Sequence, residues 1–276
     1  WPTIFAVLAA AMLLCALTTL FVPEPKTAKI PAHKSYADLI NDAVIRPFAD
    51  FVGRKGWVII LLFILFYKYG DAFGGAMANP FYHELGFTGV EIAAVSKVFG
   101  IIASLVGGII GGLIVARFGL FKTLLVGGVF QAVTNLIFSG MAWAHESGFA
   151  RDLLAYGPID PAVYIELSRQ HHVYLLKWLT AAISADNIAG GIASAALVAY
   201  LSGLCNVAFT ATQYALFSSF MAQGRTILSA GSGWMADHTD WVSFWALTTL
   251  MAIPGLLLLL WISRLYPQGL TQKPND

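Results

Sequence analysis

Five charged side chains lie well inside otherwise apolar stretches of the sequence, and their types suit proton and anion chemistry. They are Lys68, Asp71, Lys97, Asp186 and Arg225. A charge within the hydrocarbon of a membrane is costly, so such residues commonly line the path of an ion or a substrate. A carboxylate in such a place can take up and release a proton, and a cation can hold an anion. These five residues are therefore the first candidates for a functional site.

Lys68 and Asp71 are three residues apart, so on a helix they share one face and can neutralise each other. Two interpretations remain open: a structural ion pair, or a proton or substrate site whose pair opens and closes. Asp186 has no charged residue close to it in its own segment, so its partner must be a proton or come from another segment. The hypothesis is that Asp71, Asp186 or both take up a proton when a cationic partner moves away, with Lys68 and Arg225 as the exchanging partners.

Arg225 and Lys97 are candidates for holding an anionic substrate. Arg225 could instead cap a helix end or pair with Asp71 or Asp186. Three further candidates could donate hydrogen bonds to a substrate: Asn187, Gln213 and Tyr214.

The composition is that of an integral membrane protein. Of 276 residues, 58% are apolar and only 11% are charged, whereas ordinary soluble domains carry roughly 25% charged residues. The mean hydropathy is +0.73. A net charge of +1 gives no reason to expect nucleic acid as a partner. The two cysteines lack metal-ligand spacing, and neither a metal, a cofactor nor a disulfide is expected.

The apolar residues form seven blocks, each close to the ~20 residues that cross a bilayer as a helix. The predicted transmembrane helices are residues 1–22, 56–81, 91–116, 121–144, 173–204, 210–236 and 241–265. The fifth is overlong, so part of it must tilt or lie outside the hydrocarbon. The chain starts within an apolar block and without methionine, and we expect it to be a fragment.

Basic residues gather in the loops of one side, which predicts orientation. On that side lie Lys26, Lys29, Lys34, Arg46, Arg54, Lys55, Arg117, Lys122, Arg264 and Lys273, against Arg151 and Arg169 on the other. This bias places the loop 23–55 and the C-terminal tail in the cytoplasm. The loop also has apolar residues at helical spacing around Pro47, which predicts a kinked amphipathic helix on the membrane surface.

The segment 1–22 has no charge, and the segments 121–144 and 241–265 carry charge only at their ends, at Lys122 and Arg264. Every third helix is therefore uncharged in its apolar part and is expected to face lipid. Gln131 and Asn135, which lie in the second of these, are interpreted as helix-packing residues. The period of three suggests three-helix repeats around a central cavity, the arrangement of the major facilitator superfamily. We therefore expect an all-α membrane bundle of about seven transmembrane helices.

The sequence lacks the motifs of the common hydrolytic enzymes. It contains no P-loop, no His-Glu-x-x-His and no Gly-x-Ser-x-Gly. We therefore predict a transporter and not an enzyme.

Four stretches resemble the AmpG family of muropeptide permeases within the major facilitator superfamily. They are FYKYGDAF at 66–73, Ser96-Lys97, ADNIAGG at 185–191 and LCNVAFTATQYAL at 204–216. The resemblance covers most of the chain from the loop 23–55 onward. The sequence departs from the family pattern at two places. It has Asp186 where members tend to have Glu, and its loop at 145–172 is longer.

The resemblance implies that the seven segments correspond to helices six to twelve of a twelve-helix transporter. Residues 1–22 would be the last helix of a missing N-terminal half, and 23–55 a cytoplasmic loop between the halves. Residues 56–265 would form the C-terminal six-helix half, and 266–276 a cytoplasmic tail. Arg117 and Lys122 flank a turn that resembles the superfamily's cytoplasmic gate motif, although they could serve only as topology-setting charges.

The resemblance also implies a function: proton symport that imports anhydromuropeptides across the bacterial inner membrane for peptidoglycan recycling. The partners would be the lipid bilayer, the missing N-terminal half, protons and a small glycopeptide. Another solute such as a siderophore on the same scaffold remains an alternative. A membrane-embedded enzyme or a structural membrane protein is a weaker one.

Overall fold

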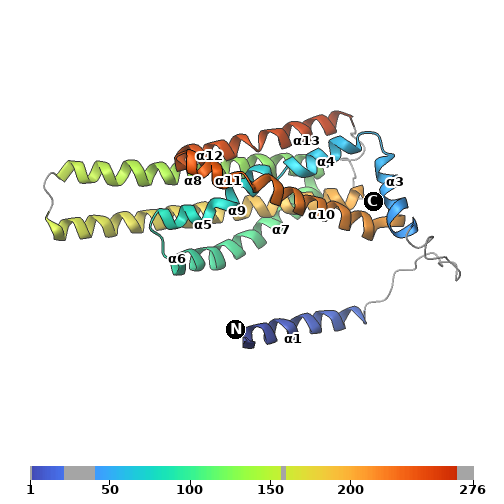
Figure 1. The fold of residues 1–276 in the computed structure, drawn as a ribbon, viewed down its shortest axis with the longest axis horizontal. Helices are drawn as coiled ribbons and strands as arrows, with labels where there is room; N and C mark the ends of the chain where they lie inside the picture. Colours follow the sequence, from blue (N-terminus) through green and yellow to red (C-terminus); the bar gives the residue numbers. More distant parts are fainter. Residues whose placement is uncertain (1, 22–40, 157–159, 266–276) are drawn as a thin grey trace. The chain divides into compact units, whose positions relative to one another are not determined.

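The computed structural model describes residues 2–21, 41–156 and 160–265, and within these ranges it contains helices and no strand. The predicted all-α membrane class is therefore confirmed. The chain divides into two units, residues 1–42 and residues 43–276. Each unit is described here by itself (Figure 1).

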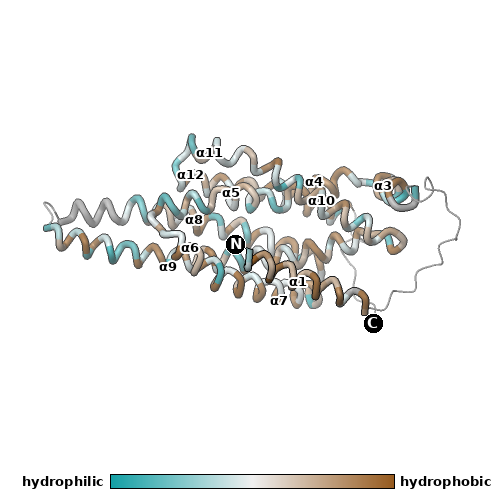
Figure 2. Tube along the Cα trace, turned by 60° about the horizontal axis from the view of Figure 1, so that its bottom comes forward, coloured by the Kyte–Doolittle hydropathy of each residue, from teal (hydrophilic) through white to brown (hydrophobic). Residues whose placement is uncertain are grey.

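The described part of the first unit is the helix α1, Pro2–Thr19, with a turn after it. The helix has no acidic residue in its first turn and no basic residue in its last turn. Its described side chains are exposed, and Figure 2 colours it mostly brown for apolar residues. An apolar helix without such charges is suited to lipid as its surrounding.

The second unit is a bundle in which short and long helices alternate. Its helices are α3 (Arg46–Val52), α4 (Trp57–Phe66), α5 (Tyr69–Glu84), α6 (Gly89–Ala94), α7 (Ile101–Phe118), α8 (Leu120–Tyr156), α9 (Pro161–Leu204), α10 (Thr210–Ser229), α11 (Ser232–His238), α12 (Trp241–Leu250) and α13 (Ile253–Leu265). Two π-helical turns, Asn41–Ile45 and Val95–Gly100, lead into α3 and α7, and a 3₁₀ turn, Val207–Phe209, precedes α10.

Five helical stretches of the described residues are long and apolar enough to cross a membrane. They are Trp57–Glu84, Gly89–Phe118, Leu120–Gly148, Pro161–Leu204 and Trp241–Leu265. The other two of the seven predicted spans differ: α1 is a shorter apolar helix, and the stretch 210–236 is divided between α10 and α11. The two helices meet at Ala230 and Gly231, and together they have a larger proportion of polar residues than the five long spans.

The stretch 145–172 is mostly helical and does not form the long loop that was predicted. The helix α8 runs on to Tyr156, and α9 begins at Pro161, with Asp160 as its cap. The Asp160 carboxylate accepts a hydrogen bond from the Ala162 backbone N–H at 2.8 Å. The helix α9 has 44 residues; at 1.5 Å per residue it is about 66 Å long, roughly twice the hydrocarbon thickness of a bilayer. One end of α8 and α9 therefore extends well beyond the other helices, as Figure 1 shows.

The helix α9 is held between α7 and α8 by glycines that allow close approach. A Cβ atom on Gly107 of α7 would lie 2.3 Å from the Ile188 carbonyl oxygen, and one on Gly111 would lie 2.8 Å from the Ile192 Cα. On the other side, a Cβ on Gly127 of α8 would lie 2.9 Å from the Ala193 Cα. Such contacts between backbones are the small-residue packing of membrane helices. They fix the depth and rotation of α9 against both neighbours.

The described basic residues that the sequence places on the cytoplasmic side lie at one end of the second unit, which we call the basic end. There α3, the α7–α8 turn and the last turn of α13 come together (Figure 1), carrying Arg54, Arg117, Lys122 and Arg264. A hydrophobic cluster around Phe51, Leu124 and Ile262 packs at this end. A second cluster around Phe81, Met141 and Leu175 packs at the opposite end. The candidate charged residues lie in the layer between the two clusters, which we call the charged layer.

Candidate functional site

Lys68 and Asp71 lie where the span Trp57–Glu84 is broken into α4 and α5. Lys68 precedes the first residue of α5 with φ −109° and ψ 19°, outside the helical range, and Asp71 lies in the first turn. A carboxylate there is favoured by the helix dipole. The Lys68 Nζ is 3.7 Å from the Asp71 Oδ2, and the two side chains are 17% and 23% exposed. The predicted ion pair is present. Because its N–O distance is longer than that of a hydrogen bond, the pair can open without breaking one.

Asp186 lies on α9 opposite a polar face of α8. The Thr134 hydroxyl donates a hydrogen bond to the Asp186 Oδ1 at 3.0 Å, and Thr134 is fully buried. Asp71 repels the Asp186 carboxylate and Lys68 attracts it, so the three charges form one electrostatic group. Asn187, the next residue, donates from Nδ2 to the Ile183 carbonyl oxygen of its own helix at 2.8 Å.

The segment 121–144, which was expected to face lipid, also has an inner face, where Gln131 and Asn135 pack as the sequence predicted. Gln131, Thr134 and Asn135 are buried on the side of α8 that meets the other helices. The opposite side carries exposed apolar residues such as Val126 and Val133. The segment therefore has a lipid-type face and a polar inner face, and Gln131 and Asn135 pack within the bundle next to the charged layer. The sequence contained this signal, because residues 131, 134 and 135 are three and four apart and share one helical face.

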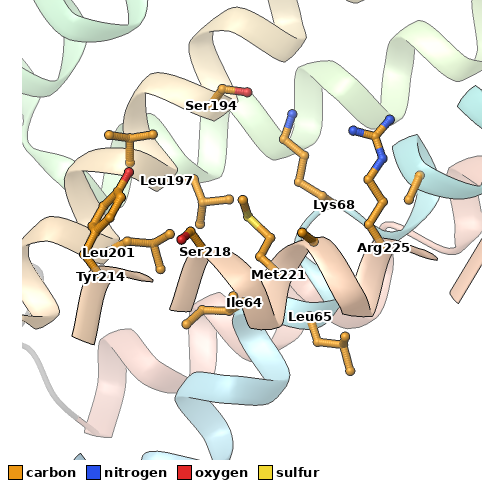
Figure 3. Close-up of a pocket in the computed structure, with 13 residues that line it drawn as sticks. Ile64, Leu65, Lys68, Ser194, Leu197, Leu201, Tyr214, Ser218, Met221 and Arg225 are labelled. Atoms are coloured by element: carbon orange, nitrogen blue, oxygen red, sulfur yellow. The ribbon is translucent and has the colours of Figure 1, made fainter. Parts of the chain in front are cut away.

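Lys68 and Arg225 open into one cavity of about 260 Å³ between α4, α5, α9 and α10. Figure 3 shows both side chains extending in the same direction from their helices. Tyr214 lines the same cavity, together with Ser194. Within the described residues, no carboxylate pairs with Arg225. This cavity therefore offers two cations and several hydroxyl groups on an otherwise apolar wall.

Asp186 and Lys97 line a second cavity of about 620 Å³, together with Asn187 and His83. Lys97 is exposed and lies in the π-helical turn before α7. Such turns often occur at functional sites, because the extra residue rotates the side chains that follow. Within the described part, Lys97 has no carboxylate partner either. The charged residues thus line two cavities, one with Lys68 and Arg225 and another with Asp186 and Lys97.

Gln213 does not line either cavity, and its predicted role as a substrate ligand needs correction. Its side chain is fully buried. Its Nε2 donates to the Pro47 carbonyl oxygen at 3.0 Å and to the Asp50 Oδ2 at 2.8 Å, and its Oε1 accepts from the Asn206 backbone N–H at 2.7 Å. Both donor hydrogens are in use, so none is left for a sugar. Gln213 instead fastens α3 to the start of α10.

Arg54 completes this fastening at the basic end. It donates to the Asp50 Oδ2 at 2.6 Å and to the Leu204 carbonyl oxygen at the end of α9. Hydrogen bonds, first of all from Gln213, hold the pKa of Asp50 below its ordinary value of 3.8. Because the folded pKa is depressed, the carboxylate stabilises the attachment of α3 at neutral pH, and this stabilisation is lost as the pH falls below 3.8.

We predict that Gln213→Leu loosens α3. Leaving the buried Pro47 carbonyl and Asn206 N–H without partners costs about 1–3 kcal/mol, so trypsin cleavage after the exposed Lys55 accelerates about 10-fold or more at neutral pH. Gel analysis of a digestion time course measures this. Gln223→Leu, on the exposed side of the same helix, is the control and leaves the cleavage rate unchanged. Equal cleavage of both variants would contradict the fastening.

The gate-turn candidates lie at the α7–α8 turn. Arg117 and Lys122 are both exposed, and the Arg117 guanidinium lies 5.6 Å from the centre of the Phe118 ring. Gly119 between them has φ 85°, a conformation that favours glycine. Both charges lie at the surface of the basic end, away from both cavities.

At the end of the bundle opposite the basic end, the adjacent histidines His171 and His172 make different contacts. His172 Nε2 is 2.7 Å from the Glu91 Oε1, which joins α9 to α6, whereas the His171 ring faces the His145 ring at 5.7 Å. The described residues contain no group of three metal-ligating side chains. The histidine contacts thus join helices.

Comparison with known proteins gives relatives over almost the whole chain. It is 34% identical over 262 residues to the anhydromuropeptide permease of Escherichia coli, an alignment that covers 94% of this chain and 46% of the relative. It is 32% identical over 263 residues to a Rickettsia conorii protein provisionally named transporter AmpG 4, covering 95% of this chain and 57% of that protein. The chain thus spans about half the length of these curated relatives. No protein-family model matches it. On the strength of these relatives and of the helical membrane bundle, the chain belongs to the AmpG family of the major facilitator superfamily.

Proposed function

We propose that this chain is the C-terminal half of a proton-coupled importer of anhydromuropeptides in the bacterial inner membrane. The observation that carries the proposal is the charged layer, in which Lys68 pairs with Asp71 and attracts Asp186, and whose residues line two cavities. Residues 56–265 would form one wall of a central cavity, and a preceding N-terminal half would form the other. The names of the relatives, permease and transporter, favour transport over enzyme chemistry.

The energy source follows from the carboxylates. Low-dielectric surroundings favour the protonated form of a carboxylic acid, and a nearby cation favours the ionised form. A carboxylate whose cation moves away during the switch between inward- and outward-facing states would therefore take up a proton. Asp186, Asp71 or both would act in this way, with Lys68 as the exchanging cation.

The substrate class follows from the cations. An anhydromuropeptide combines sugars with a peptide that bears carboxylates, so its cavity needs both positive charge and hydrogen-bond donors. Arg225, Lys68, Tyr214 and Ser194 line one cavity, and Lys97 and Asn187 line the other. Charge-assisted hydrogen bonds from arginine to carboxylate are about twice as strong as neutral ones. We assign Arg225 and Lys97 to the substrate and Asn187 and Tyr214 to its polar groups.

The direction of transport follows from the orientation. The basic end carries Arg54, Arg117, Lys122 and Arg264, and the positive-inside rule puts such an end in the cytoplasm. An inward proton gradient would then drive import, which serves the recycling of peptidoglycan fragments. Arg117 and Lys122 would act at the cytoplasmic gate.

Neutralising Arg225 tests the substrate assignment. In the full-length transporter, Arg225→Gln raises the apparent KM for labelled anhydromuropeptide about 10- to 100-fold, because a charge-assisted hydrogen bond of about 1.5–3 kcal/mol is lost. Initial uptake rates in proteoliposomes measure this. The control Arg264→Gln, an exposed cation at the end of α13, leaves KM unchanged. An unchanged KM in Arg225→Gln would remove Arg225 from the substrate site.

A further inference from the structure

The Thr134 hydroxyl lies within hydrogen-bond distance of two acceptors at once. Its Oγ1 is 3.0 Å from the Asp186 Oδ1 and 2.8 Å from the Gln131 carbonyl oxygen of its own helix. Thr134 is fully buried, so water does not compete for either contact. The arrangement joins α8 to the carboxylate of α9 in the middle of the bundle.

A hydroxyl group has a single proton and can donate one full hydrogen bond, while its oxygen can accept others. When Asp186 is ionised, it can only accept, so the Thr134 proton points to it. When Asp186 is protonated, its own O–H can donate to the Thr134 oxygen, and the Thr134 proton turns to the Gln131 carbonyl. Both protonation states are therefore satisfied without moving a heavy atom.

Other groups around Asp186 lack this property. The titratable groups on the elements facing it are Lys68, Asp71, Tyr82, His83 and Lys97. The buried part of α8 adds no titratable side chain there. Within the described residues, the Thr134 hydroxyl is the one side-chain hydrogen bond to the Asp186 carboxylate. A nearby polar group, the Gln131 Nε2, is buried and has no hydrogen-bond partner among the described residues.

We infer that Thr134 is a positioning residue that holds Asp186 in one place in both protonation states by reversing the direction of their hydrogen bond. This rests on the proposed role of Asp186 in proton coupling. A proton from water in the cavity lined by Asp186 and Lys97 joins the Asp186 carboxylate, and the new O–H donates to the Thr134 oxygen. On release the proton returns to water, and Thr134 donates to the carboxylate again. The cycle needs no reactant other than the proton.

The pH profile of uptake tests the inference. Thr134→Val keeps the shape of the side chain and removes the hydroxyl. The charged carboxylate loses more by this than the neutral acid, because hydrogen bonds to ionised groups are the stronger ones. In the full-length transporter, the midpoint of proton-driven uptake therefore moves to higher pH, by about half a unit to one unit. Thr134→Ser retains the hydroxyl and the wild-type midpoint.

A buried threonine on the same helix supplies the control. The Thr123 hydroxyl donates only to the carbonyl oxygen of Gly119, in the turn before α8, so Thr123→Val leaves the midpoint unchanged even if it lowers the amount of protein. Thr134→Ala replaces the valine variant if that variant does not reach the membrane. A wild-type midpoint in Thr134→Val or Thr134→Ala overturns the inference, as does an equal shift in Thr123→Val.

Asp186→Asn, measured alongside, separates this inference from the proposed function. If it abolishes proton-driven uptake while Thr134→Val keeps the wild-type midpoint, the positioning role alone fails. If Asp186→Asn retains full proton-driven uptake, the coupling role of Asp186 and the inference built on it both fail.

Discussion

Replacing Asp186 by Asn abolishes accumulation of substrate against its gradient, while exchange of substrate across the membrane persists. The carboxylate is the group that takes up the proton, and an amide of the same shape cannot do so. Exchange needs no net proton movement, so the binding site and the conformational switch can still carry it. The measurement compares gradient-driven uptake with counterflow in proteoliposomes that contain the full-length transporter.

Two further variants sharpen this experiment. Asp71→Asn tests the other carboxylate of the layer, and a loss of coupling there assigns the proton to the pair. Asp237→Asn is the control, because Asp237 is exposed at the end of α11. Accumulation at the normal rate, still sensitive to uncouplers, in both Asp186→Asn and Asp71→Asn would return the charged layer to a purely structural role.

Replacing Gly107 by Val destroys the packing of α7 against α9. Even the first side-chain carbon would lie 2.3 Å from the Ile188 carbonyl oxygen and 2.8 Å from its Cα. These are backbone atoms, so no side chain can turn aside to relieve the overlap. Overpacking of this kind costs about 3 kcal/mol, which lowers the melting temperature by roughly 6–12 °C. Thermal unfolding of the detergent-solubilised protein measures it.

The neighbouring glycine is a matched control. A Cβ atom on Gly108 would meet nothing within 4 Å, so Gly108→Val leaves the melting temperature close to that of the wild type. Gly111 and Gly112 repeat the contrast one turn later, with contact at the first and open space at the second. Equal destabilisation at both positions of a pair would contradict the helix packing described here.

The sequence predicted those features that depend on residue type and spacing along a single helix. The membrane class follows from the long apolar segments, and the Lys68–Asp71 pair from a separation of three residues. The glycines at residues 107, 108, 111 and 112 have the spacing of close helix packing, but this spacing cannot select which member of each pair makes the contact. Only the rotation of α7 decides that Gly107 packs against α9 and Gly108 does not.

The features that the sequence did not reveal depend on contacts between distant segments. Thr134 and Asp186 are 52 residues apart, and Gln213 and Asp50 are 163 apart. Gln213 was a candidate substrate ligand because its amide can donate hydrogen bonds to a substrate. Its three contacts instead come from α3 and from the residues just before α10. The segment 121–144 was expected to face lipid because it has no charge after Lys122, yet uncharged polar residues suffice to line an inner face.

The central claim is that the charged layer couples protons to the import of an anhydromuropeptide. The most direct test is uptake of labelled anhydromuropeptide into proteoliposomes of the full-length transporter, with and without an imposed inward proton gradient and with a ferric siderophore as the alternative substrate. The account predicts that anhydromuropeptide accumulates only when the gradient is present and that the siderophore does not accumulate. Equal accumulation with and without the gradient, or transport of the siderophore in place of the muropeptide, would contradict it.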